Sequence, residues 1–211
     1  MTDSLKAYNL EQCFGDTQLW RIDQLTLSPG RVIHLRGENG SGKTTLLKVL
    51  SGLQKPSKGQ VLFNNQPVKP GHKVCYLHQQ PYMFDRSVRR NLELVLQSRS
   101  DKRVEKKKTL QEVLFWSGLS MQADQPARTL SGGERQALAM ARAKLCNPSF
   151  WLLDEPTSNL DEKGIRRCVE LVSTLQATGA SIILTTHQTG LLTELCDQTW
   201  WLKQGALITH E

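Results

Sequence analysis

Residues 37–45, with the sequence GENGSGKTT, most strongly restrict how this chain can fold. They follow a strand-like apolar run at residues 31–35 and precede a helix-like run expected from about residue 42 to residue 53. Glycines let a backbone turn tightly and approach an anion closely, and a helix that starts there presents unpaired N–H groups. The spacing G-x-x-x-x-G-K-T between a strand and a helix therefore predicts a loop that binds the phosphates of a nucleoside triphosphate.

Two side chains of this loop have specific expected roles. Lys43 brings a mobile positive charge to the β- and γ-phosphates, and Thr44 brings a hydroxyl to Mg²⁺. The alternative is a glycine-rich turn that binds nothing, and the complete motif in this context argues against it. The nucleotide-binding residues expected in the loop are Gly37, Asn39, Gly40, Ser41, Gly42, Lys43, Thr44 and Thr45.

Composition narrows the possible partners. The 211 residues include 27 Lys and Arg against 20 Asp and Glu, a formal net charge of +7 that suits polyanions. The basic run at residues 102–108 contains no aromatic residue of the kind that stacks on bases, so a solvated surface is favoured over nucleic-acid binding. The five cysteines form no C-x-x-C pair, which argues against a zinc site and a disulfide framework. No apolar run approaches the roughly 20 residues that span a bilayer, so a membrane role requires a partner.

The pattern of apolar residues predicts an α/β fold. The unbroken apolar run at residues 150–153 suits a strand that is covered on both faces of a parallel sheet, and residues 181–186 are expected to form another buried strand. Residues 200–208 favour a terminal hairpin around Lys203-Gln204-Gly205. Further strands are expected near residues 5–27, 61–63 and 74–77.

The stretch between these two groups of strands has the apolar spacing of helices. Residues 81–144 carry helical spacings, and Ser131 with Glu134 has the S-x-x-E form of a capping box that opens a helix. We therefore expect one domain, residues 1–211. It would combine an α/β core of about residues 1–80 and 145–211 with an inserted helical lobe of about residues 81–144.

Polar residues stand at the ends of the two apolar strands, where ligands bind in open α/β sheets. Asp154 can hold Mg²⁺ there, and the adjacent Glu155 can polarise an attacking water. A pair of solvated acids is the alternative. His187 follows the second strand and can reach a γ-phosphate, although a lone histidine is often structural. The histidines at positions 34, 72, 78 and 210 have no such context.

Three further motifs resemble those of ABC ATPases. Residues 130–136, LSGGERQ, look like the family's signature sequence, and residues 152–156, LLDEP, resemble its second nucleotide motif. Residues 158–161, SNLD, resemble its D-loop, represented here by Ser158, Leu160 and Asp161. The motifs occur in the family's order along essentially the whole chain. The resemblance implies a P-loop ATPase core with a mainly parallel sheet, an N-terminal antiparallel β subdomain and the inserted α-helical lobe.

The resemblance also assigns residues. Glu155 corresponds to the general base, His187 to the switch histidine, and Gln79 to the glutamine that touches Mg²⁺ and the water, with Gln80 as the alternative. The metal set is then Thr44, Gln79 and Asp154. The adenine would stack on Phe14 or alternatively on Tyr8, or either ring could belong to the core. The signature residues, which would close on the ATP of a second copy, are Leu130, Ser131, Gly132, Gly133 and Glu134.

The expected function is ATP hydrolysis for a transporter. The implied ligands are ATP and Mg²⁺, and the implied partners are a second copy or a related ATPase subunit, membrane permease subunits and a solute-binding protein. Such a subunit would be cytoplasmic, attached to the inner face of the membrane, and would serve the import of a small solute. Residues 76–84 are weakly reminiscent of importers for oxyanions such as tungstate.

Several alternatives stay open or are disfavoured. Residues 81–84 could receive a permease helix or could fill the lobe's own core. A soluble ABC ATPase that acts on nucleic acid is the alternative function, although two cassettes or a long coiled-coil insert would be typical of it. A P-loop kinase or GTPase is disfavoured, because the signature is present and no Asn-Lys-x-Asp motif occurs.

Overall fold

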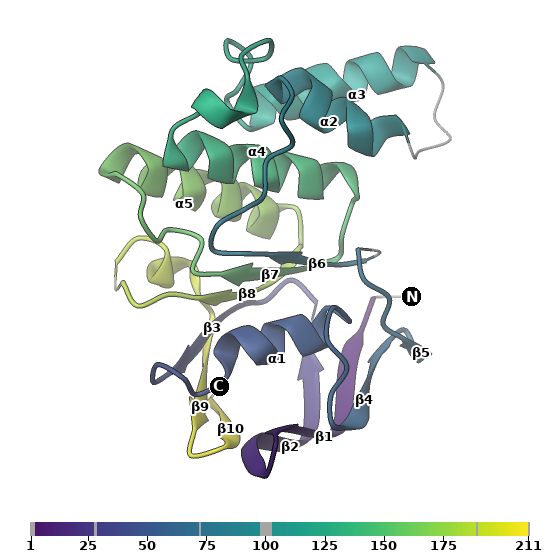
Figure 1. Ribbon diagram of the computed structural model, residues 1–211, viewed down its shortest axis with the longest axis vertical. Helices are drawn as coiled ribbons and strands as arrows, with labels where there is room; N and C mark the ends of the chain where they lie inside the picture. The colour runs from purple at the N-terminus through teal and green to yellow at the C-terminus, as the bar shows by residue number, and fades with distance from the viewer. Residues whose placement is uncertain (1–2, 28, 72, 98–102, 189, 211) are drawn as a thin grey trace.

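The computed structural model describes residues 3–27, 29–71, 73–97, 103–188 and 190–210, and it has an α/β fold (Figure 1). Its strands are β1 Leu5–Phe14, β2 Thr17–Leu27, β3 Val32–Gly37, β4 Lys58–Phe63, β5 Gln66–Pro67, β6 Val74–Leu77, β7 Phe150–Asp154, β8 Ser181–Thr185, β9 Gln198–Lys203 and β10 Ala206–His210. Its helices are α1 Lys43–Leu50, α2 Val88–Gln97, α3 Arg103–Trp116, α4 Gly132–Leu145 and α5 Glu162–Ala177, with short 3₁₀ turns η1 Ala127–Thr129 and η2 Thr193–Leu195.

All described strands belong to one sheet with the order β5-β4-β1-β2-β10-β9-β3-β8-β7-β6. The segment from β9 to β6 is parallel, whereas β1 pairs antiparallel with both β2 and β4. A single parallel pair, Ala206 with Arg21, joins β10 to β2. The predicted combination of a mainly parallel core, an N-terminal antiparallel part and a terminal hairpin is confirmed.

The apolar strands are covered on both faces, as their sequences predict. On β7, Phe150 and Leu152 pack in one cluster with the buried leucines of α1, which Figure 1 shows enclosed between β3 and the N-terminal strands. Trp151 and Leu153 alternate with them and pack in a second cluster with residues of α4 and α5. The sheet therefore separates two hydrophobic cores, and side chains of β7 pack into both of them.

Helices α2, α3 and α4 lie between β6 and β7 in the chain, where the sequence predicts a helical segment. They share one hydrophobic cluster with α5 and the adjacent face of the sheet, and Figure 1 shows them stacked over that face. The division of the chain into a core and a lobe at residues 81 and 144 stays a prediction. No helix among the described residues is long and apolar enough to cross a membrane.

Helix α1 is shorter than the expected span of residues 42 to 53. Its last regular bond runs from the Ser51 N–H to the Leu47 carbonyl at 3.0 Å, and the next N–H, of Gly52, reaches only Val49. The ladder therefore tightens to a three-residue turn and ends at Leu50. The leucine spacing that predicts the helix continues to Leu53, but the helical hydrogen bonding stops before it.

Candidate functional site

The phosphate loop runs from the end of β3 into α1. Gly42 precedes the helix in a left-handed conformation with φ 96°. A β-carbon at this position would lie 2.6 Å from Leu19 Cδ2 and 2.8 Å from Trp20 Cδ1. Only glycine accepts both constraints without displacing its neighbours. The first turn of α1 then presents N–H groups at the loop, together with the positive end of the helix dipole.

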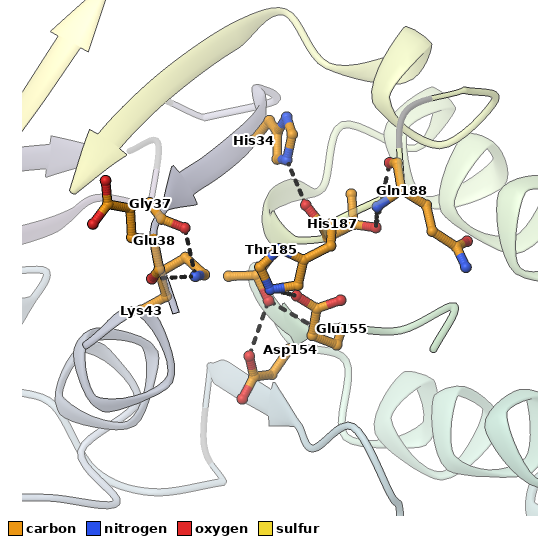
Figure 2. A network of polar contacts seen from close by, with 10 residues as sticks. His34, Gly37, Glu38, Lys43, Asp154, Glu155, Thr185, His187 and Gln188 are labelled. Atoms are coloured by element: carbon orange, nitrogen blue, oxygen red, sulfur yellow. Dashed lines mark hydrogen bonds and ion pairs between the residues drawn. The ribbon is translucent and has the colours of Figure 1, made fainter. Parts of the chain in front are cut away.

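Lys43 lies across this loop. Its Nζ donates to the carbonyls of Gly37 at 2.8 Å and Glu38 at 3.0 Å (Figure 2). Burial lowers the pKa of Lys43, an effect that the nearby carboxylates Glu155 and Asp154 oppose. The ammonium group is thus held within the loop, in place to exchange carbonyl oxygens for phosphate oxygens.

Asp154 ends β7 and is 4% exposed. Two hydroxyls donate to its carboxylate, Tyr76 from β6 to Oδ2 at 2.8 Å and Thr185 from β8 to Oδ1 at 2.9 Å. Burial raises the pKa of Tyr76, and the charge of Asp154 and the bond to it act in the same direction. The Tyr76 hydroxyl therefore keeps its proton and orients the carboxylate.

Glu155 turns away from Asp154. Its backbone is left-handed, with φ 48°, and its N–H donates to Thr185 Oγ1 at 2.9 Å. Its Oε1 lies 3.3 Å from Nε2 of His187, whose side chain is 57% exposed (Figure 2). A carboxylate and an imidazole thus face each other beside the phosphate loop, which is an arrangement suited to proton transfer from water.

One pocket of about 720 Å³ gathers most of the residues expected from the sequence. Phe14 is 57% exposed and lines this pocket, while Tyr8 does not appear among the described lining residues. Gly37 and Ser41 also lie outside the lining, although Gly37 contributes the carbonyl that Lys43 binds. The expected residues that line it are Phe14, Asn39, Gly40, Gly42, Lys43, Thr44, Thr45, Gln79, Asp154, Glu155, Ser158 and His187.

Of the two glutamines, Gln79 lines this pocket and Gln80 does not. The Gln80 N–H donates to Nδ1 of His78 at 3.0 Å, so the His78 ring closes the turn. Both glutamines line a second pocket of about 450 Å³, which begins beside the first and reaches Gly132.

The signature segment forms the start of α4. Ser131 is its N-cap, and Ser131 with Glu134 forms the predicted capping box. The Ser131 N–H donates to Glu134 Oε2 at 2.9 Å, and this bond lowers the pKa of Glu134. Leu130 is buried in the core, and its carbonyl accepts from Arg135 at 2.6 Å.

The D-loop lies between the phosphate-loop pocket and the signature segment. Ser158 borders the pocket at the phosphate loop, Leu160 borders the second pocket, and Asp161 caps α5 by accepting from the Gly164 N–H at 2.8 Å. Among the described residues, none of residues 130–134 lines the pocket at the phosphate loop. The fold therefore brings together the phosphate loop, the acidic pair and His187, and it leaves the signature outside.

Sequence reasoning missed the groups that contact Asp154 and Thr186, the residue before His187. Tyr76 and Thr185 stand near the ends of β6 and β8, the two neighbours of β7, and this placement could have suggested hydroxyl donors to Asp154. His34 carries no recognisable signal, yet its Nε2 lies 3.2 Å from the Thr186 carbonyl.

The oxygen donors fit a magnesium ion. Thr44, Gln79 and Asp154 line the same pocket and offer a hydroxyl, an amide and a carboxylate. The described residues contain no group of three or more His, Cys, Asp or Glu that could enclose a metal. Mg²⁺ usually takes few protein ligands and completes its shell with water and substrate phosphates, so this donor set suits it.

The fold and this pocket define a P-loop nucleotide hydrolase. The sequence matches the family described as ABC transporter over residues 21–158, and the chain belongs to that family. It is therefore an ATPase with the cassette fold of ABC transporters.

Relatives and a solved structure agree with this assignment. The cytochrome c biogenesis ATP-binding export protein CcmA of Bordetella parapertussis is 36% identical over 86% of this chain and 83% of that protein. The Fe(3+) ions import ATP-binding protein FbpC 2 of Haemophilus influenzae is 32% identical over 97% of this chain and 60% of that protein. The structure of cbiO1 from Clostridium perfringens, part of the ABC transporter complex cbiONQ, has a TM-score of 0.86 at 28% identity, covering 97% of this chain and 86% of that chain.

Proposed function

We propose that this ABC ATPase drives solute transport by hydrolysing Mg·ATP at a site that a second copy completes. One observation carries the proposal: the phosphate loop, Asp154, Glu155 and His187 share one pocket, and the signature of the same chain lies outside it. A signature helix that presents N–H groups to an anion needs a nucleotide from elsewhere.

Each residue of the pocket has a proposed role. Lys43 binds the β- and γ-phosphates, and Phe14 stacks on adenine. Thr44, Gln79 and Asp154 would hold Mg²⁺, and the ion would supply positive charge to neutralise the phosphates. Glu155 accepts the proton of the attacking water, and His187 donates to the γ-phosphate.

The second copy would act through the segment Ser131–Glu134 and the D-loop. With two nucleotides shared across the interface, ATP binds the closed dimer better than the open one and shifts the population toward it. Cleavage of the γ-phosphate removes the bridging contacts and lets the dimer open. A related ATPase subunit could replace the second copy without changing this chemistry.

The surface after Gln79 suits the docking of a membrane permease. Tyr82 and Phe84 are 73% and 40% exposed and contact each other edge to face, whereas Met83 packs inward against the core. The Phe84 backbone is held from both sides by Asn91, which accepts from its N–H and donates to its carbonyl at 3.1 Å each. A rigid pair of exposed aromatic rings favours a docking surface over a purely internal role.

We propose that the chain works on the cytoplasmic face of the membrane, attached to its permease. We infer import of a small solute, with a solute-binding protein as a further component, from the resemblance of residues 76–84 to the subunits of small-solute importers. An oxyanion such as tungstate stays a prediction from residues 76–84.

Co-purification with its permease tests the proposal. The tagged chain is expressed in its native cells and recovered from membranes solubilised in mild detergent, and ATP hydrolysis is measured before and after reconstitution with candidate solutes. Recovery of a stoichiometric membrane protein and transport that stops on Lys43→Ala support a transporter. The alternative is a soluble ABC ATPase that acts on nucleic acid, and the net charge of +7 is the observation that favours it. Recovery of the chain with RNA or DNA after a salt wash would support this alternative.

A further inference from the structure

His34 is a buried residue of β3 with a polar contact outside its own strand pairs. It is 6% exposed, and its Nε2 lies 3.2 Å from the carbonyl oxygen of Thr186. Because a carbonyl oxygen only accepts hydrogen bonds, Nε2 must carry the proton. Figure 2 shows the ring reaching toward the segment that carries His187.

The backbone of His34 is fixed by the sheet. It pairs with Leu184 of β8 on one side and with Thr199 of β9 on the other, and β3 leads directly into the phosphate loop at Gly37. His34 and Leu184 form the last pair between β3 and β8, so the backbone of Thr186 lies beyond that ladder. The side chain of His34 makes a contact between this segment and β3.

The contacts of residues 185–188 divide into internal and external ones. Thr186 Oγ1 accepts from the Gln188 N–H at 3.1 Å, which shapes the segment internally. Thr185 Oγ1 bonds to Asp154 and to the Glu155 N–H, which ties the end of β8 to β7. The bond from His34 to Thr186 ties the next residue to β3, immediately before His187.

We propose that His34 is a positioning residue that fixes the Thr186 carbonyl and thereby holds His187 against Glu155 and the γ-phosphate. The inference rests on the proposed role of His187. It connects two elements that both reach the phosphate pocket: β3 with its loop, and the end of β8. Loss of the bond lets the His187 backbone shift while the loop that binds ATP stays in place.

The surroundings keep the imidazole neutral. Burial lowers the pKa of His34, the Thr186 bond opposes this effect, and the charges of Arg36 and His187 lower the pKa further. A neutral ring has one N–H, and the carbonyl of Thr186 selects the Nε2 tautomer. The donor is therefore present at neutral pH without a buried charge.

Three substitutions of His34 separate its donor from its bulk. His34→Gln places an amide N–H near the position of Nε2, His34→Asn places it near Nδ1 and short of the carbonyl, and His34→Ala removes it. We expect the Asn and Ala variants of the purified chain to lose about fivefold to tenfold in kcat, the cost of one hydrogen bond, with KM for Mg·ATP nearly unchanged. The Gln variant should recover the native kcat within about twofold.

A double substitution distinguishes positioning from a general effect on folding. In a His187→Ala background, His34→Asn should cost almost nothing further, because no imidazole remains to be positioned. Thermal unfolding followed by circular dichroism identifies the folded variants, and the Gln and Asn pair carries the test if the Ala variant does not fold.

Several results would overturn the inference: equal rates for the Gln and Asn variants, a rise in KM in place of the fall in kcat, or a full effect of His34→Asn without His187. A native rate for the His187→Ala single variant would overturn the proposed role of His187 together with this inference. A slow His187→Ala variant beside a native-rate His34→Asn variant would overturn the inference alone.

Discussion

Gly133 of α4 and Gly164 of α5 touch backbone to backbone. A β-carbon on Gly133 would lie 2.6 Å from Cα of Gly164, and one on Gly164 would lie 3.1 Å from Cα of Gly133. Gly133 belongs to the signature segment. Gly164 lies in the first turn of α5, and its N–H donates to the carboxylate of Asp161, which caps this helix. The signature segment therefore packs directly against the first turn of α5, and the second glycine of the signature has a packing role besides any contact with nucleotide.

The substitution Gly133→Ala tests this contact. Alanine favours a helix over glycine by about 1 kcal/mol, but the clash with a backbone atom forces the helices apart at a cost of about 1–3 kcal/mol. We expect a net loss of stability in urea unfolding and a weaker ATP-dependent dimer. The exposed Ser173→Ala on α5 is the control. An unfolding midpoint at or above the native one would contradict the tight contact.

Glu155→Gln tests the proposed base. Glutamine keeps the size and the contact toward His187 but cannot take a proton from water, so we expect hydrolysis to fall about 10²- to 10⁴-fold. ATP binding should persist, and light scattering during size exclusion with Mg·ATP should find a dimer.

The variant Glu112→Gln, at an exposed position of α3, controls for the lost charge. Normal turnover by the Glu155→Gln chain, with a monomer in Mg·ATP, would show that another group accepts the proton.

The parts of the site that sequence patterns predict are local. The phosphate loop is one continuous motif, and the capping box at Ser131 and Glu134 spans a single helical turn. Similarly, the unbroken apolar run of β7 predicts that the strand is buried on both faces, because successive side chains point to opposite faces and both sets are apolar. These features depend on neighbours in the chain, which the sequence displays directly.

The parts that the sequence does not reveal depend on strand order and register. Tyr76 reaches Asp154 because β6 lies beside β7, and His34 reaches Thr186 because β3 lies beside β8, across 152 residues of chain. A histidine in an apolar strand gives no sign of its partner. Glu155 likewise combines a positive φ with a bond from its N–H to Thr185, a residue 30 positions away in the chain.

Lys43→Ala tests the phosphate contact. The side chain now donates to the carbonyls of Gly37 and Glu38, so the loop loses two internal bonds as well as a cation for the phosphates. A charged hydrogen bond contributes about 1.5–3 kcal/mol, so calorimetry should find ATP binding weakened about tenfold to hundredfold. Lys55→Ala, which removes the same charge from an exposed loop, should bind normally. Native affinity in the Lys43 variant would exclude this role.

Tyr76→Phe tests the support of the magnesium ligand. It removes the donor to Oδ2 of Asp154 and leaves Thr185 on Oδ1, so the carboxylate is free to rotate about its Cβ–Cγ bond. Supporting hydrogen bonds of this kind change metal affinity about tenfold or more. We expect the free Mg²⁺ needed for half-maximal hydrolysis to rise by about tenfold, with most of the rate restored at saturating Mg²⁺.

The exposed Tyr82→Phe removes an equivalent hydroxyl outside the pocket and is the matched control. If magnesium titrations of the two variants and the native chain coincide, the Tyr76 hydroxyl does not orient the metal ligand. If the Tyr76 variant loses rate equally at all magnesium concentrations, the hydroxyl acts on the chemical step and not on the metal. Only a shift of the titration curve to higher magnesium concentration matches an Asp154 carboxylate that has lost one of its two hydrogen-bond donors.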